Sequence, residues 1–189
     1  MSGNEFELPM NNITIWVGIG VDSQLRSIRE RISKLEQELA IPNSNLTLPF
    51  HISLKMSFSV DRSKSNEVIN AIETYYRTVK PFQIPVQGIE YHETIAWIRM
   101  AENETLNRIH DDLNEMLLDR FGVGLHEYDR DYLFHTTLFM DDDAYKVLRG
   151  YEAIRNEPLP KTLVANQFLI GSSETGALGT YHIISETRK

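Results

Sequence analysis

One pattern of five residues occurs twice in this chain, 84 residues apart, and it constrains the fold more than any other feature. The sequences FHISL at 50–54 and FHTTL at 134–138 both have the form Phe-His-x-(Ser/Thr)-Leu. Each copy lies in a segment whose alternating or β-branched and aromatic residues are typical of a β-strand. Side chains i and i+2 of a strand lie on the same face, so each histidine is expected beside a hydroxyl. The chain is therefore expected to contain two similar strands that each present a histidine and a hydroxyl together.

The segments around the two copies repeat a common order of secondary structure. Strands rich in β-branched and aromatic residues alternate with helices whose apolar residues are spaced three and four apart. Each half has a strand, a helix, a strand and a helix before its closing strand or strands. This order predicts a duplicated α+β unit. The predicted strands are 13–21, 48–60, 82–90, 95–100, 134–140, 162–170 and 181–185, and the predicted helices are 25–39, 63–79, 102–120 and 144–155.

The composition narrows the classes of protein to consider. The chain has 189 residues, a net charge of −8 and no cysteine, which excludes disulfides, thiolate zinc sites and a cysteine nucleophile. The acidic balance argues against binding long duplex nucleic acid, which needs many Lys and Arg contacts to phosphate. No apolar segment approaches the roughly 20 residues of a membrane helix, and the polar, acidic start is unlike a signal peptide. We therefore expect a cytoplasmic protein that does not bind membranes.

The two histidines suit proton transfer at a phosphate. An imidazole with an ordinary pKa of about 6.5 can take up or release a proton, so His51 and His135 can act as general base and general acid. The hydroxyls of Ser53 and Thr137 can donate hydrogen bonds to phosphoryl oxygens. One copy alone is more simply explained as an ordinary strand histidine with an incidental hydroxyl. Two copies on matching strands of matching half-units favour the catalytic interpretation.

Paired motifs of this form, separated by about half a chain, resemble the 2H phosphoesterase superfamily, which includes 2′-5′ RNA ligase-like proteins and 2′,3′-cyclic phosphodiesterases. By layout, the resemblance covers nearly the whole chain. It implies one bilobal domain over residues 1–189, with lobes at approximately 12–93 and 94–187 related by a pseudo-twofold axis. It also implies antiparallel sheets that line a central groove, with the helices outside.

The resemblance further implies phosphodiester chemistry that uses neither a metal nor a cofactor. His51 and His135 would be catalytic, and Ser53 and Thr137 would bind the substrate phosphate. The expected reaction is hydrolysis of a 2′,3′-cyclic phosphate or a 2′-5′ phosphodiester, with ligation as its reverse. The expected substrate is a nucleotide or a short single-stranded RNA end, and the protein is expected to be a monomer. We take His135 as the base and His51 as the acid.

Three alternatives differ from this interpretation. The chain could hydrolyse cyclic or 2′-5′ linked signalling oligonucleotides, or it could be a nucleotide-binding module without catalysis. It could also be a metal phosphohydrolase, because His110 and Asp111 form an adjacent pair of the kind that binds metals. The intact His51 and His135 argue against a non-catalytic module. The metal site would need further His or Asp ligands that the sequence does not place near His110.

The surroundings of the motifs offer further candidates for substrate contact. The second copy is followed by the acidic run 141–143, where RNA-ligase-like members often carry a basic residue. Strand alternation places Lys55 on the face of His51, where it could supply positive charge, and Arg130 and Tyr132 precede the second copy. A base could stack on one or two aromatic side chains. The candidates for stacking are Trp16, Phe58, Tyr91, Trp97, Tyr128 and Tyr132.

Overall fold

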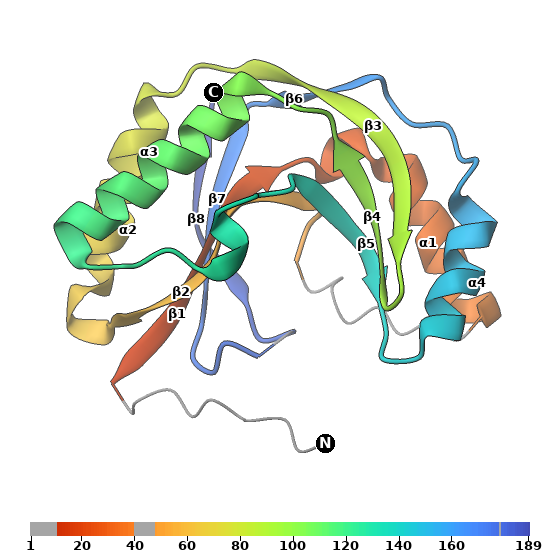
Figure 1. The fold of residues 1–189 in the computed structure, drawn as a ribbon, viewed down its shortest axis with the longest axis horizontal. Helices are drawn as coiled ribbons and strands as arrows, with labels where there is room; N and C mark the ends of the chain where they lie inside the picture. Colours follow the sequence, from red (N-terminus) through yellow and green to blue (C-terminus); the bar gives the residue numbers. More distant parts are fainter. Residues whose placement is uncertain (1–10, 40–47, 178) are drawn as a thin grey trace.

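The computed structural model describes residues 11–39, 48–177 and 179–189 (Figure 1). The strands are β1 (Asn12–Gly20), β2 (His51–Asp61), β3 (Phe82–His92), β4 (Ile95–Met100), β5 (His135–Met140), β6 (Thr162–Ala165), β7 (Gln167–Ser173) and β8 (His182–Arg188). The helices are α1 (Arg26–Leu39), α2 (Ser65–Thr78), α3 (Glu104–Phe121) and α4 (Ala144–Ile154), and a short 3-10 helix, η3 (Glu127–Asp129), lies between α3 and β5.

The described strands form two antiparallel sheets, with the orders β2-β1-β7-β8 and β5-β4-β3-β6. The α+β class and the antiparallel sheets are as predicted. The lobes expected at 12–93 and 94–187 do not coincide with the sheets, because each sheet takes strands from both ranges. β1 pairs with β2 and with β7, which lies near the end of the chain, and β3 pairs with β4 and β6. Each sheet is therefore built by pairing strands that are distant in sequence, and the two sheets do not correspond to two consecutive halves of the chain.

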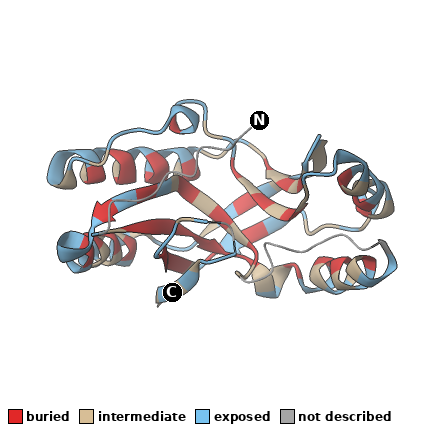
Figure 2. Cartoon of the chain, turned by 90° about the horizontal axis from the view of Figure 1, so that it is seen from below, coloured by how far each residue is buried: buried red, intermediate tan, exposed pale blue. Residues whose placement is uncertain are grey.

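The helices cover the outer faces of the two sheets (Figure 1). Helices α2 and α3 lie against the sheet that contains β2 and β8, and α4 packs on β3 and β4 with α1 beside it. The predicted apolar stripe of α1 is confirmed, since Ile28, Ile32 and Leu35 are buried. Figure 2 shows that buried residues lie on the sheets and on the helix faces turned toward them. Within the residues described, no helix is both long and apolar enough to cross a membrane.

The segment predicted as one strand over 162–170 is divided between the two sheets. β6 pairs with β3, and β7, which begins two residues after β6 ends, pairs with β1. The chain therefore passes from one sheet to the other at Asn166. The apolar residues on either side of Asn166 and Gln167 are compatible with one strand or with two, because local periodicity does not reveal which strand is the neighbour.

The two strands that carry the repeated motif occupy equivalent places. β2 is an edge strand of one sheet and β5 is an edge strand of the other. The two edges lie side by side without a ladder of hydrogen bonds between them among the described strands. Side chains at the start of β2 and of β5 can therefore approach one another across the junction of the two sheets.

Candidate active site

The two motif copies meet at one pocket of about 270 Å³ between the sheets. His51 and His135 are the first residues of β2 and β5 and both line this pocket, together with Ser53 and Thr137. The predicted alternation holds at both copies, since the residues between them in each strand, such as Ile52, are buried on the opposite face. The other lining residues are Trp16, Leu48, Pro49, Phe50, Met56, Ser57, Tyr132, Met140, Gly179 and Tyr181.

Each histidine is held in the same way by the backbone just before it. Nδ1 of His51 lies 2.8 Å from the carbonyl oxygen of Pro49, and Nδ1 of His135 lies 2.7 Å from that of Leu133. A carbonyl oxygen only accepts hydrogen bonds, so Nδ1 donates in both rings. The neutral rings therefore carry their proton on Nδ1 and keep the lone pair of Nε2 for another partner.

The residue before each histidine is also fixed in an equivalent way. The N–H of Val21 donates to the carbonyl oxygen of Phe50 at 2.8 Å, and the N–H of Met100 donates to that of Phe134 at 2.9 Å. The first copy has one further hydrogen bond, in which the N–H of Phe50 donates to Asp22 Oδ1 at 3.0 Å. Each imidazole is thus placed by main-chain hydrogen bonds between neighbouring segments of its own sheet.

The two tryptophans of the chain lie one against each histidine. The ring of Trp16 meets that of His51 edge-on, with centroids 4.2 Å apart, and the ring of Trp97 tilts over that of His135 at 4.6 Å. Trp16 is buried and donates through Nε1 to Ser53 Oγ at 3.0 Å, whereas Trp97 donates to Glu90 Oε2 at 3.2 Å. Sequence reasoning named both only as possible stacking surfaces, since no local signal links them to the motifs.

Burial gives the two histidines unequal acidities. Loss of hydration is the main cause that lowers the pKa of His51, to about 4, and the charge of His135 lowers it further. Loss of hydration also lowers the pKa of His135, and Arg99 contributes to this while Glu90 opposes it. Both rings are thus neutral at neutral pH in the ligand-free protein, and a bound anion would favour their protonated forms.

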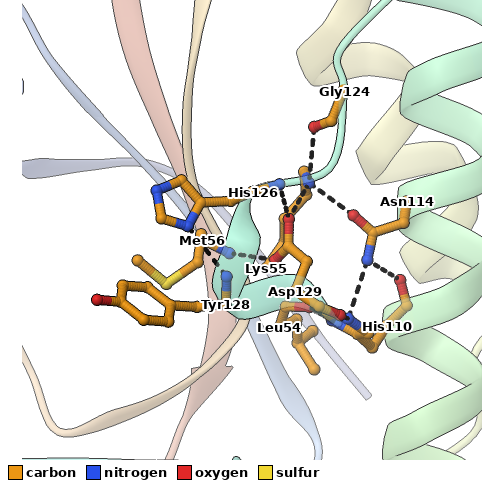
Figure 3. A network of polar contacts seen from close by, with 9 residues as sticks. All are labelled: Leu54, Lys55, Met56, His110, Asn114, Gly124, His126, Tyr128 and Asp129. Atoms are coloured by element: carbon orange, nitrogen blue, oxygen red, sulfur yellow. Dashed lines mark hydrogen bonds and ion pairs between the residues drawn. The ribbon is translucent and has the colours of Figure 1, made fainter. Parts of the chain in front are cut away.

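Lys55 does not lie at the pocket, contrary to the expectation from strand alternation. Its side chain is only 1% exposed, and Nζ donates to Asp129 Oδ2 at 2.7 Å and to Asn114 Oδ1 at 2.6 Å (Figure 3). The register between β1 and β2 shifts at this point, so β2 contains extra residues in a bulge. A bulge reverses the alternation of side chains, which turns Lys55 toward α3, on the side where Leu54 is buried.

Asp129 is held ionised by the groups around it. Burial acts to raise its pKa, but hydrogen bonds from Lys55 and from the backbone N–H groups of His126 and Met56 outweigh that effect and lower the pKa. These contacts tie η3 and the loop before β5 to the middle of β2 (Figure 3). The positive charge of Lys55 is therefore neutralised inside the protein, away from the histidine pocket.

The other two candidates for substrate contact differ from each other. Tyr132 lines the pocket with both histidines. Arg130 is exposed and lines a different pocket, together with Arg99, and Tyr132 borders that pocket as well. The structure therefore does not bring Arg130 to the histidine pocket, and its contact with the substrate stays a prediction. One wall of the histidine pocket, with Gly179 and Tyr181, comes from the segment before β8 and was not foreseen.

His110, the residue of the metal alternative, belongs to the buried network of Lys55. Its Nδ1 lies 2.8 Å from the carbonyl oxygen of Leu54 and its Nε2 lies 2.9 Å from that of Asp129 (Figure 3). Both ring nitrogens are thus engaged by the protein. Within the described part of the chain, no group of three or more His, Cys, Asp or Glu side chains is placed to hold a metal ion.

The fold is similar to solved structures over nearly its whole length. Escherichia coli LigT complexed with NADP+ aligns with a TM-score of 0.57 and 16% identity, covering 92% of this chain and 95% of that chain. The protein TT0787 of Thermus thermophilus aligns with a TM-score of 0.63 and 14% identity, covering 93% and 97%. LigT complexed with 3′-AMP aligns with a TM-score of 0.56 and 14% identity, covering 93% and 97%. A search of curated proteins gives no match.

Two antiparallel sheets that each bring a histidine and a hydroxyl to a shared pocket define the 2H phosphoesterase class. The family model of the 2′-5′ RNA ligase superfamily matches residues 24–176, a range that includes both motif copies. The chain belongs to this superfamily. The resemblance that the paired motifs indicated is thereby confirmed.

Proposed function

We propose that this protein is a phosphodiesterase that hydrolyses a 2′,3′-cyclic phosphate or a 2′-5′ phosphodiester at a nucleotide or a short RNA end. One observation carries the proposal: His51, Ser53, His135 and Thr137 line the same pocket, and each histidine keeps Nε2 for a partner. This arrangement places two proton-transfer groups and two hydrogen-bond donors around a space that one phosphate would occupy.

In the proposed reaction, water attacks the phosphorus and forms a new P–O bond. Nε2 of neutral His51 takes a proton from that water, while protonated His135 gives one to the leaving ribose oxygen as its P–O bond breaks. The products are a phosphomonoester and a free ribose hydroxyl, which for a cyclic phosphate lie on the same ribose. For a 2′-5′ diester, the reverse of these steps joins the two products and releases water, which is ligation. Ser53 and Thr137 donate to the non-bridging oxygens as charge develops on them.

This assignment reverses the roles suggested from the sequence. His51 is the more strongly dehydrated ring, and its pKa of about 4 keeps it neutral, as a base must be. The pKa of His135 is lowered as well, mainly by loss of hydration and then by Arg99, but the charge of Glu90 opposes that shift and favours the protonated form that an acid needs. An anionic substrate in the pocket favours protonation of the second ring further. His51 is therefore the proposed base and His135 the proposed acid.

The size and surroundings of the pocket support a small substrate. A volume of about 270 Å³ lies just below the range of sites for drug-sized ligands, roughly 300–1,000 Å³, so it suits a phosphate with an adjoining sugar. The net charge of −8 disfavours long duplex nucleic acid. The crystal structures of LigT with 3′-AMP and with ATP support nucleotide binding as part of the proposal. We propose a cytoplasmic monomer that acts without a metal or a cofactor.

The decisive experiment is a panel of 2′,3′-cyclic nucleotides, 2′-5′ dinucleotides and matched 3′-5′ dinucleotides, followed by separation of the products. We expect conversion of a cyclic or 2′-5′ substrate to a phosphomonoester, and loss of that conversion in a His51→Ala/His135→Ala double variant. Cyclic and 2′-5′ oligonucleotides in the panel test the signalling alternative. A protein that binds these compounds without converting any of them would be a binding module, and the proposal would be wrong.

A further inference from the structure

The indole of Trp16 lies in a space, its seat, that is open only because residues 18 and 171 are glycines. Trp16 is paired directly with Gly171 across β1 and β7, and Gly18 follows two residues later on its own strand. A β-carbon at Gly18 would lie 2.7 Å from Cζ2 of the indole, and one at Gly171 would lie 2.8 Å from Cε3. Both distances are shorter than any normal carbon contact. The absence of two side chains therefore lets the ring lie against the sheet.

The seat directs the indole N–H at one atom of the candidate site. Nε1 of Trp16 donates to Ser53 Oγ at 3.0 Å, a normal length for such a hydrogen bond. An indole N–H can only donate, so the serine oxygen must accept and its own proton has to go elsewhere. Ser53 lines the pocket, and its hydroxyl is left to donate there, to the Tyr132 hydroxyl in the ligand-free protein and to an anion that takes its place.

The indole ring of Trp16 also packs against His51. The edge of the indole faces the imidazole at a centroid distance of 4.2 Å and an interplanar angle of 68°. Trp16 is 6% exposed and so excludes water from this side of the pocket. Trp97 does not repeat the arrangement, because its N–H donates to Glu90 and not to Thr137, its neighbour on β5. The two hydroxyls of the candidate site are therefore not oriented alike.

We infer that Trp16 is a positioning residue that makes Ser53 an obligatory hydrogen-bond donor to the phosphoryl oxygen of the substrate. Gly18 and Gly171 serve this role by admitting the ring. The inference rests on the proposed function for its substrate, a phosphodiester anion, but the hydrogen bond between Trp16 and Ser53 can be tested without turnover. Trp16 acts through Ser53, so its contribution should disappear when the serine hydroxyl is removed.

A double-mutant cycle in kcat tests this coupling. Trp16→Phe keeps an aromatic ring and removes the N–H, and we expect it to lower kcat about tenfold and to raise KM several-fold, because a donor to the bound phosphate is weakened. In the Ser53→Ala background the same change should cost less than about twofold. The matched control is Trp97→Phe, whose effect should simply multiply with that of Ser53→Ala. Equal losses from Trp16→Phe with and without Ser53 would overturn the inference.

Two measurements that need no turnover separate this inference from the proposed function. The chain has two tryptophans, so its ¹⁵N spectrum contains two indole N–H signals, and Trp97→Phe identifies the one from Trp16. Ser53→Ala should shift the Trp16 signal, and Trp16→Phe should weaken binding of inorganic phosphate several-fold in the wild type but not in Ser53→Ala. An unmoved signal, or phosphate binding indifferent to Trp16, would overturn the inference even if the substrate panel succeeds. A panel without turnover would defeat the proposed function, and these two measurements would still decide the role of Trp16.

Discussion

His51 and His135 begin edge strands of different sheets and line the same pocket. Each donates from Nδ1 to the carbonyl oxygen two residues before it, so the two rings are held by the same local device in both halves of the chain. The equivalence breaks down in their surroundings, where Trp16 donates to Ser53 while Trp97 donates to Glu90.

Removal of either histidine should remove one proton transfer. We expect His51→Ala and His135→Ala each to lower kcat by about 10²–10⁴-fold on the best substrate of the panel. The two groups act in one step, so the double variant should lose less than the product of the single losses. Steady-state kinetics with a thermal unfolding control would check this. Full turnover by His51→Ala would refute the paired mechanism.

A substrate with a good leaving group should separate the base from the acid. A nitrophenolate leaves without a proton, so with a nucleotide nitrophenyl ester His135→Ala should cost less than about tenfold. His51→Ala should keep its full loss, because water still needs a base. The comparison is the ratio of kcat for the nitrophenyl and ribose leaving groups in each variant. The opposite result would restore His135 as the base.

The hydroxyl side chains should contribute less than the histidines. Ser53→Ala and Thr137→Ala each remove one donor to the phosphoryl oxygens, and we expect losses in kcat of about 10- to 1,000-fold. Ser53→Thr and Thr137→Ser keep a hydroxyl and serve as matched controls. Control variants as inactive as the alanine variants would show that packing, and not hydrogen bonding, is at stake.

The pH dependence of kcat/KM should report the lowered pKa values of the free protein. His51 is the proposed base and cannot accept a proton once it is protonated, so kcat/KM should fall below about pH 4. His135 is the proposed acid and cannot give a proton once it is neutral. The value of kcat/KM should therefore fall as the pH rises through the pKa of His135, which lies below 6.5. The profile should be a bell with an acidic maximum, and the kcat profile should lie at higher pH because the bound anion favours protonation. The maximum of such a bell lies midway between its two pKa values, so a kcat/KM maximum above about pH 7 would show that at least one of the two values is not lowered.

The buried pair of Lys55 and Asp129 should matter for stability and not for chemistry. Lys55→Met leaves a carboxylate buried without its cation, and we expect a loss of about 3–5 kcal/mol in the free energy of unfolding, measured in urea. Lys55→Met/Asp129→Leu should cost less than the two single changes together. The pKa of Asp129 is lowered by folding, so its stabilisation is complete above its ordinary pKa of about 3.9 and is lost as the pH falls through the folded value. A loss below about 1 kcal/mol for Lys55→Met would mean that the carboxylate reaches water when its partner is removed.

The repeated motif determined much of the candidate site by itself. Strand alternation is a local property, so it correctly placed Ser53 beside His51 and Thr137 beside His135 and buried the residues between them. Helical spacing is local as well, and the buried stripe of α1 followed from it. The repetition of these local patterns was enough to indicate the superfamily to which the chain belongs.

The tertiary structure decided what depends on the partner strand. The bulge that turns Lys55 inward arises from the register of β2 against β1, and the change of sheets at Asn166 arises from which strands pair with β6 and β7. The seat of Trp16 requires Gly171, which lies 155 residues away in the sequence. Pairing, register and close approach are relations between distant segments. The sequence of one segment determines which face its side chains share, but the neighbouring strand determines where that face points.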